Sequence, residues 1–362
     1  MASKDVELGR ATAEVAEQVV RELTAADRAL QSVGLGEVPD YAINGGLLVS
    51  AVPQNVLNMA EVRQRVTLAA LWRLWARSKN VAAMHPSMAS ELATYQLGTL
   101  PGQLFRNLAQ RPPNLMVVFA EPETIALDTG GTGRLLAILF CGRTEPEKLL
   151  CLTSDPRMEE VAVTVVSEPQ ADDGTPLPPP PGGSAPVLEF CHLSIPVGAD
   201  SKFTVEDLAL RLARKRGREE PTDAQRGMVE RALQVAVYLC SSKADITAPP
   251  TLRGKSANSG KQRRWNKPDS FLRLGWRLGP RLKAARVRVQ EARQSAARST
   301  DGTGAAGGWR QYPHQRAGHM KTVWVGPGRS LADSRLIEPY WVSQDLVDAN
   351  GEAPEGIIRP VR

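Results

Sequence analysis

Residues 115–166 decide the fold, because they hold four short apolar runs: LMVVFA (Leu115–Ala120), LLAILF (Leu135–Phe140), LLCLT (Leu149–Thr153) and VAVTVV (Val161–Val166). Clusters of Gly, Pro, Asp or Thr separate the runs, with no helix-length pattern between them. This spacing predicts an antiparallel sheet. The continuous apolar character indicates burial on both faces, by helices or by a second layer. A further run, Val187–Ile195, predicts one more strand, with His192 held inside the sheet by a hydrogen bond.

Two helices are predicted before the sheet. Val6–Leu30 places apolar residues on one face at steps of four and three: Val15, Val19, Leu23, Ala26 and Leu30. The second helix is predicted over Met59–Lys79, where Trp72 and Trp75 lie three residues apart. An aromatic pair at helical spacing is typical of a core, and we assign these tryptophans to it.

The links within and after the sheet also carry signals. Gly130–Gly133 lies between two runs and lacks the lysine of a phosphate-binding loop, so a hairpin turn is predicted there. Residues 167–186 include seven prolines and predict an extended, solvated loop. Two helices follow, each opened by a capping-box pair: Val205–Lys215 by Thr204 and Asp207, and Ala224–Cys240 by Thr222 and Gln225.

Composition is that of an ordinary globular protein, with 42% hydrophobic and 23% charged residues in 362. The expected class is α+β: N-terminal helices (1–110), a mainly antiparallel sheet with helices and the Pro-rich loop (111–248), a basic loop and helix (249–308), and a basic α+β C-terminal module (309–362). The four cysteines are widely spaced and predict buried free thiols. No metal or cofactor is expected, and the absence of a membrane-length apolar run makes the cytoplasm the expected location.

Positive charge is concentrated near the C-terminus. Residues 251–341 hold 19 Lys/Arg against 5 Asp/Glu, a balance of +14 within a chain whose net charge is +6. Such asymmetry predicts a polyanionic partner, most simply RNA, although the basic part could instead dock on an acidic protein surface. Within this part, Trp265 could stack on a base, and a basic helix over Leu278–Arg298 could follow phosphates through cations that include Arg281, Arg286 and Arg288.

The stretch Trp309–Val342 is the candidate functional module. Two strand-like runs, Lys321–Val325 and Ser334–Val342, flank Gly326–Arg329, where glycine and proline predict a turn. Candidate binding residues are the cations and aromatic side chains Arg316, Lys321, Trp324, Arg329, Tyr340 and Trp341. His314 and His319 would supply the base and the acid of a metal-free ribonuclease, because imidazole titrates near neutrality. Both histidines could equally fix the hairpin by hydrogen bonds, and we favour binding or structure over catalysis.

The order His-x-Arg-x-Gly-His (His314–His319), then WVGPGR (Trp324–Arg329), then Ile-x-Pro-Tyr-Trp-Val (Ile337–Val342) resembles the C-terminal region of a family of phage- and plasmid-borne proteins. The family includes an anti-CRISPR protein acting on the type V-A CRISPR nuclease. One departure is Met320, where an aromatic residue is expected.

The resemblance implies a regulatory anti-defence protein that recognises a nascent peptide or RNA, with the N-terminal segment of a CRISPR nuclease as a candidate target. It also implies that such a protein lowers expression of its target by promoting loss of the message. The residues alone leave a ribonuclease or a general RNA-binding protein as alternatives.

Overall fold

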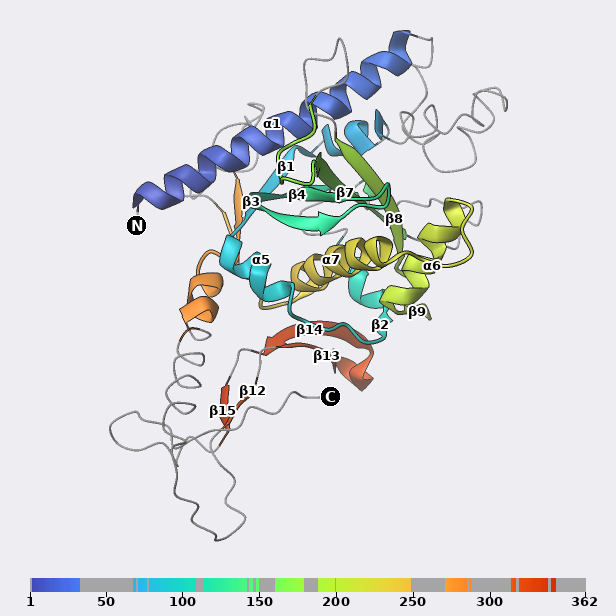
Figure 1. Ribbon diagram of the computed structural model, residues 1–362. Coiled ribbons are helices and arrows are strands. Elements are labelled where there is room, and N and C mark those ends of the chain that lie inside the picture. The colour runs from blue at the N-terminus through green and yellow to red at the C-terminus, as the bar shows by residue number, and fades with distance from the viewer. Residues whose placement is uncertain are drawn as a thin grey trace, which may run out of the picture.

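The computed structural model describes residues 2–32, 68–69, 71–76, 78–108, 114–141, 143–145, 148–149, 160–178, 188–198, 200–248, 271–284, 287, 314–316, 319–337 and 340–342. A seven-stranded sheet lies at the centre of this part, in the order β10-β11-β1-β3-β4-β7-β8 (Figure 1). Its strands are β1 (Asn80–Met84), β3 (Leu115–Ala126), β4 (Thr132–Cys141), β7 (Glu160–Gln170), β8 (Glu189–Pro196), β10 (Ile246–Thr247) and β11 (Leu272–Leu274). Strand β1 runs parallel to both neighbours, whereas the other four pairings are antiparallel.

Helices cover both faces of the sheet (Figure 1). The long helix α1 (Ala2–Ser32) and the helical residues 71–76 bury one face, where Trp75 and Leu23 are fully enclosed. The opposite face packs against α5 (Pro86–Leu92), α6 (Val205–Lys215), α7 (Asp223–Cys240) and the 3-10 helix η2 (Gly102–Asn107). A sheet enclosed in this way explains why its strands are continuous apolar runs.

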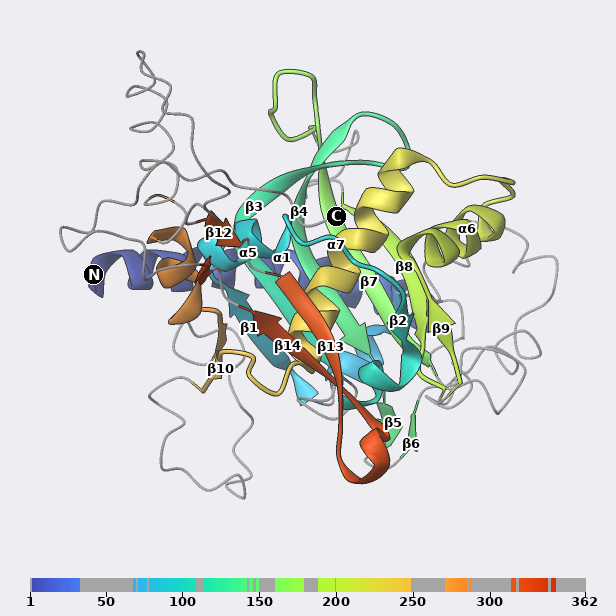
Figure 2. The same cartoon turned by 90° about the horizontal axis from the view of Figure 1, so that it is seen from below.

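A β-hairpin forms a further layer on the outer side of α7. Figure 2 shows β13 (His319–Val325) and β14 (Leu331–Ile337) crossing over that helix, on the side away from the sheet. Short ribbons complete the structure: β2 (Leu100–Pro101) with β9 (Lys202–Phe203), β5 (Arg143–Glu145) with β6 (Lys148–Leu149), and β12 (His314–Arg316) with β15 (Tyr340–Val342). The hairpin is therefore supported by a rigid, buried helix.

The predicted α+β class, with an N-terminal helix and a mostly antiparallel sheet, is confirmed. Both capping boxes are present, so α6 and α7 start at Val205 and Asp223, at or next to the predicted residues. In α1, Val19, Leu23 and Ala26 are buried as predicted. The pair Trp72 and Trp75 lies at the core with ring centroids 5.6 Å apart.

Two predictions about strands were wrong. The run Leu149–Thr153 was expected to join the sheet, but Leu149 belongs to the ribbon β5–β6, the rest of the run lies outside the described residues, and β7 pairs directly with β4. The solvated loop was expected to start at Ser167, but β7 continues to Gln170 and both Ser167 and Glu168 are buried. A strand can extend through Pro169 here because proline removes only one backbone donor, and the pairing with β4 persists at that residue.

The sheet takes strands from three of the four segments expected from the sequence, and the division into domains itself stays a prediction. Three cysteines, Cys141, Cys191 and Cys240, are buried and free, as predicted. Burial raises the pKa of Cys141 to about 12 and that of Cys191 to about 11, so both remain thiols at neutral pH. Among the described helices, none has the length and apolar character that crossing a membrane requires.

Candidate functional site

The predicted turn at Gly326–Arg329 joins two paired strands, but the second strand was predicted over Ser334–Val342, whereas β14 spans Leu331–Ile337 and Tyr340–Val342 pairs with β12 instead. Strands β13 and β14 pair in antiparallel register from His319↔Ile337 to Val325↔Leu331. The turn contains Gly326 at φ 81° and Gly328 at φ 64°, values that favour glycine. A side chain with a Cβ at either position would strain the turn, so these glycines allow two strands of seven residues to close tightly.

Side-chain hydrogen bonds and apolar contacts anchor the hairpin to the rest of the fold. The backbone N–H and Oγ of Ser242, just after α7, donate to the Asp333 carboxylate at 3.2 and 2.9 Å. Gln103 donates from Nε2 to the Ser330 carbonyl oxygen at 3.0 Å. Ala332 is buried in the main core, and Met320 and Leu336, which face each other across the strands, pack against it. Met320 therefore contributes to packing at the position where an aromatic was expected.

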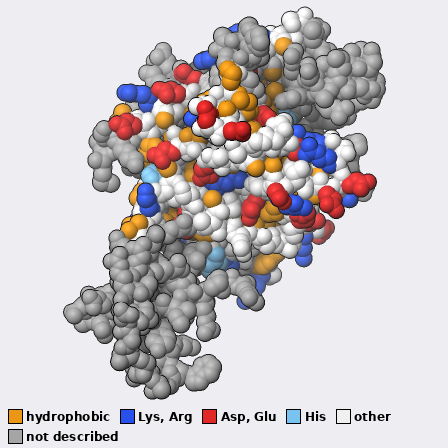
Figure 3. Space-filling model, in the orientation of Figure 1, with side chains coloured by type: hydrophobic (Ala, Val, Ile, Leu, Met, Phe, Trp, Pro, Cys, Tyr) orange, Lys and Arg blue, Asp and Glu red, His pale blue; other side chains and the backbone are white. Residues whose placement is uncertain are grey.

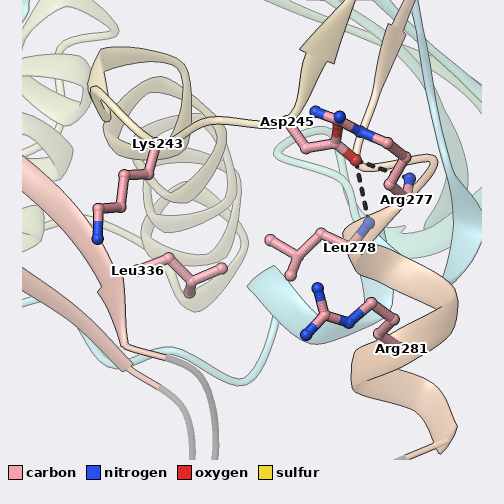
Figure 4. A pocket seen from close by; sticks show the side chains of 6 residues that line it. All are labelled: Lys243, Asp245, Arg277, Leu278, Arg281 and Leu336. Atoms are coloured by element: carbon pink, nitrogen blue, oxygen red, sulfur yellow. Dashed lines mark hydrogen bonds and ion pairs between the residues drawn. The ribbon is translucent and has the colours of Figure 1, made fainter.

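A pocket of about 380 Å³ opens where the hairpin meets two other segments. Figure 4 shows the six residues that line it. Lys243 and Asp245 come from the link after α7, and Leu336 comes from β14. Leu278 and Arg281 belong to the helix of residues 278–284, and Arg277 directly precedes it. Three cations and one carboxylate surround two leucine side chains. The pocket therefore combines a positive rim with an apolar interior.

Asp245 organises the basic side of the pocket. Its carboxylate accepts from the backbone N–H of Arg277 and Leu278 at 2.7 and 3.0 Å, and from Nε of Arg277 at 2.7 Å (Figure 4). Burial raises the pKa of Asp245, but the Arg277 side chain and the two backbone donors outweigh it and hold that pKa below its ordinary value. The carboxylate is 6% exposed and the Arg277 side chain 75% exposed. Asp245 thus holds Nε of an arginine whose side chain is mostly exposed.

The structure brings only some of the predicted site residues together. Arg281 lies in the pocket, while Lys321, Trp324 and Arg329 are exposed on the hairpin, and His319 begins β13 with an exposed side chain. His314 and Arg316 lie in β12, which pairs with Trp341 and Tyr340 of β15, but the placement of these four side chains is not described. Trp265, Arg286 and Arg288 lie outside the described residues. The roles proposed for all of these residues stay predictions.

Sequence reasoning missed Lys243, Asp245, Arg277 and the two leucines of the pocket. Arg277 contributed to the count of basic residues, but its pairing with Asp245 spans 32 positions and left no local pattern. Within the described part of the chain, no three His, Cys, Asp or Glu side chains are grouped so as to hold a metal ion.

Comparison with known proteins identifies the family. The family model described as AcrVA2-like, the anti-CRISPR type V subtype A2 family, matches residues 82–344. The chain belongs to this family. The AcrVA2-like match starts within β1 and ends just after β15, so it includes the hairpin and the pocket but not α1. Membership supports an anti-CRISPR role and an origin in a phage or another mobile element.

Two further comparisons add less. A solved structure described as the crystal structure of AcrVA2 is 13% identical, with a TM-score of 0.41 over 89% of this chain and 95% of that one. No curated protein matches the AcrVA2-like chain.

Proposed function

We propose that this AcrVA2-like protein lowers expression of a type V CRISPR nuclease by recognising its nascent polypeptide, or the RNA that encodes it, through the hairpin β13–β14 and the adjoining pocket. One observation carries the proposal. An anchored hairpin bears exposed apolar side chains at its turn, and a pocket with three cations adjoins it near its open end, at Leu336. Such a surface suits a partner that carries both apolar and negatively charged groups.

The apolar part of this surface lies at the end of the hairpin. Trp324 is 46% exposed and Leu331 is 52% exposed, although most large apolar side chains in the described residues are buried. Exposed tryptophan on a rigid support is typical of a residue that anchors a protein partner. On the face of the described structure seen in Figure 3, acidic and basic side chains are intermixed around α6.

The cationic part includes side chains on the hairpin itself. Lys321 is exposed and lies directly opposite Arg335, whose side chain is 42% exposed and pairs with Asp333 at 3.2 Å. Exposed cations of this kind contribute little to folding, which leaves them available for a partner. They are next to the pair Met320 and Leu336 in the strand register, so their side chains lie on the hairpin face opposite to the one that lines the pocket.

A co-expression experiment tests the proposal. The protein is produced together with a type V nuclease, and both the nuclease polypeptide and its message are quantified. The unaltered protein is expected to lower both, and less so when the N-terminal segment of the nuclease is replaced. Trp324→Ala combined with Leu331→Ala should restore nuclease production, because truncating an anchor typically costs about 2 kcal/mol or more of binding free energy.

Leu177→Ala is the matched control, since Leu177 is 39% exposed in the link between β7 and β8, far along the chain from the hairpin. It should leave nuclease depletion unchanged. Full depletion by the Trp324→Ala/Leu331→Ala variant, at an equal protein level, would show that the hairpin is not the recognition surface.

A further inference from the structure

The pocket beside the hairpin is a site of its own, because its charge and shape differ from those of the apolar hairpin end. Lys243 and Arg281 are exposed at its rim, and Arg277 is held there by Asp245. Figure 4 shows the Arg281 guanidinium group directed toward the space between Leu278 and Leu336. With three cations and one carboxylate, the lining is positive by two charges.

The two leucines limit the chemistry of a ligand. They belong to different elements, Leu278 to the helix of residues 278–284 and Leu336 to β14, and they face the same space (Figure 4). An inorganic anion would use the cations but would leave this apolar surface in contact with water. A volume near 380 Å³ falls in the range of small-molecule sites, about 300–1,000 Å³. A ligand with both a flat apolar body and an anionic group fits better.

We infer that the pocket binds one nucleotide unit of single-stranded RNA, with the phosphate on Lys243 and Arg281 and the nucleoside over Leu278 and Leu336. This assignment rests on the proposed function, which brings the protein to a message. Arg277 would present its outer nitrogens to the ribose–phosphate backbone or stack on the base, and guanidinium planes do both in RNA complexes.

Charge favours RNA over an acidic peptide. The described side chains between residues 271 and 337 include seven Lys/Arg and one acid, Asp333, which already accepts from Ser242. Repeated phosphates along a strand can use many such cations at once, and counterion release adds to the affinity. A single carboxylate on a peptide would occupy the rim and leave the leucines uncovered. A nucleotide would use both kinds of lining, its phosphate on the cations and its base over the leucines.

Direct binding by the full-length protein tests the assignment. Fluorescence anisotropy follows a labelled oligouridylate of about ten nucleotides, a typical length for single-strand sites, across a series of salt concentrations. Lys243→Ala combined with Arg281→Ala should raise Kd about tenfold or more, because the variant loses charge-assisted hydrogen bonds to the phosphate. The slope of log K against log salt should fall by about 0.7 for each phosphate that the variant no longer neutralises.

Lys202→Ala combined with Arg214→Ala is the matched control. It also removes one exposed lysine and one exposed arginine, from β9 and α6, and should leave Kd unchanged. Equal RNA affinity of the pocket variant and the unaltered protein would overturn the assignment. Equal binding of an oligodeoxythymidylate would also overturn it. So would displacement of the RNA by polyglutamate, if the pocket variant no longer binds polyglutamate.

The nuclease co-expression assay, run on the unaltered protein beside the anisotropy experiment, separates the two proposals. Nuclease depletion by a protein that binds no RNA in the anisotropy experiment would exclude the nucleotide site and leave the proposed function standing. RNA binding that depends on Lys243 and Arg281, in a protein that never depletes the nuclease, would support the site and exclude the proposed function.

Discussion

His192, a half-buried residue of β8, illustrates how a single side chain couples the fold to pH. Its Nδ1 lies 2.9 Å from Oγ1 of Thr164 on the neighbouring strand β7, so the hydrogen bond predicted inside the sheet is present. Its Nε2 is buried without a hydrogen-bond partner in the described part of the structure. Burial, with smaller contributions from Arg216 and Lys215, lowers the pKa of His192 from 6.5 to about 4. The folded protein therefore holds this imidazole neutral.

The direction of the pKa shift predicts acid sensitivity. Above pH 6.5 the histidine is neutral in both states and its contribution to stability is fully present. As the pH falls from 6.5 toward 4, the unfolded chain binds a proton first, so the free energy of unfolding falls by up to about 1.4 kcal/mol per pH unit. Urea denaturation at pH 7 and pH 5 should therefore show a smaller loss of stability for His192→Gln than for the unaltered protein. Equal losses would mean that other groups cause the acid sensitivity.

At the scale of elements, local signals predicted well and long-range ones did not. The helices α6 and α7 were located because a threonine and an acceptor three residues later form a capping box within four positions. The hairpin β13–β14 was located because its turn residues lie between the strands it joins. In contrast, β1 pairs with Leu272–Leu274 almost 190 residues later, and its sequence NVAAM has a single β-branched residue. The same limit applies to the pocket, whose residues come from three distant segments.

The anchor of the hairpin makes a testable prediction at this scale. Asp333 is the acceptor for two hydrogen bonds from Ser242 and the ion-pair partner of Arg335, with 12% of its side chain exposed. Asp333→Ala should lower the free energy of unfolding by about 1–3 kcal/mol, because net contributions are roughly 0.5–1.5 kcal/mol per hydrogen bond. Amide hydrogen exchange should accelerate mainly in residues 319–337.

Asp172→Ala, which removes an exposed aspartate in the link between β7 and β8, should change neither quantity. Unchanged exchange in the hairpin of the Asp333→Ala variant would indicate that the apolar contacts of Ala332, Met320 and Leu336 suffice to hold it.

The whole molecule has two distinct sides. Helix α1 covers one face of the sheet, and the hairpin lies beyond α7 on the opposite side (Figure 1). The AcrVA2-like match includes the hairpin side and excludes α1, so the side shared with the family is the one that carries the pocket. The centre of the sheet between them is buried, and residues such as Val117 and Ile138 have no exposed surface. This arrangement gives the proposed recognition surface a rigid support.

Because the pocket exists only in the folded molecule, a ligand bound there should stabilise the whole fold. Lys243, Arg281 and Leu336 lie far apart in the chain, and unfolding separates them. A ligand that binds only the folded state adds about 2.7 kcal/mol of stability at a concentration one hundred times its Kd. An oligouridylate should therefore raise the Tm by a few degrees at low salt, and the rise should shrink as salt is added.

The variant Lys243→Ala/Arg281→Ala provides the decisive comparison for this stabilisation. Its own Tm should lie close to that of the unaltered protein, since both side chains are exposed and exposed cations contribute little to folding. Its Tm should then respond weakly to the oligouridylate, whereas Lys202→Ala/Arg214→Ala should respond in full. A full response by the pocket variant would place the RNA on another part of the folded chain. A large fall in its Tm without RNA would instead mean that these cations hold the hairpin, the helix and α7 together.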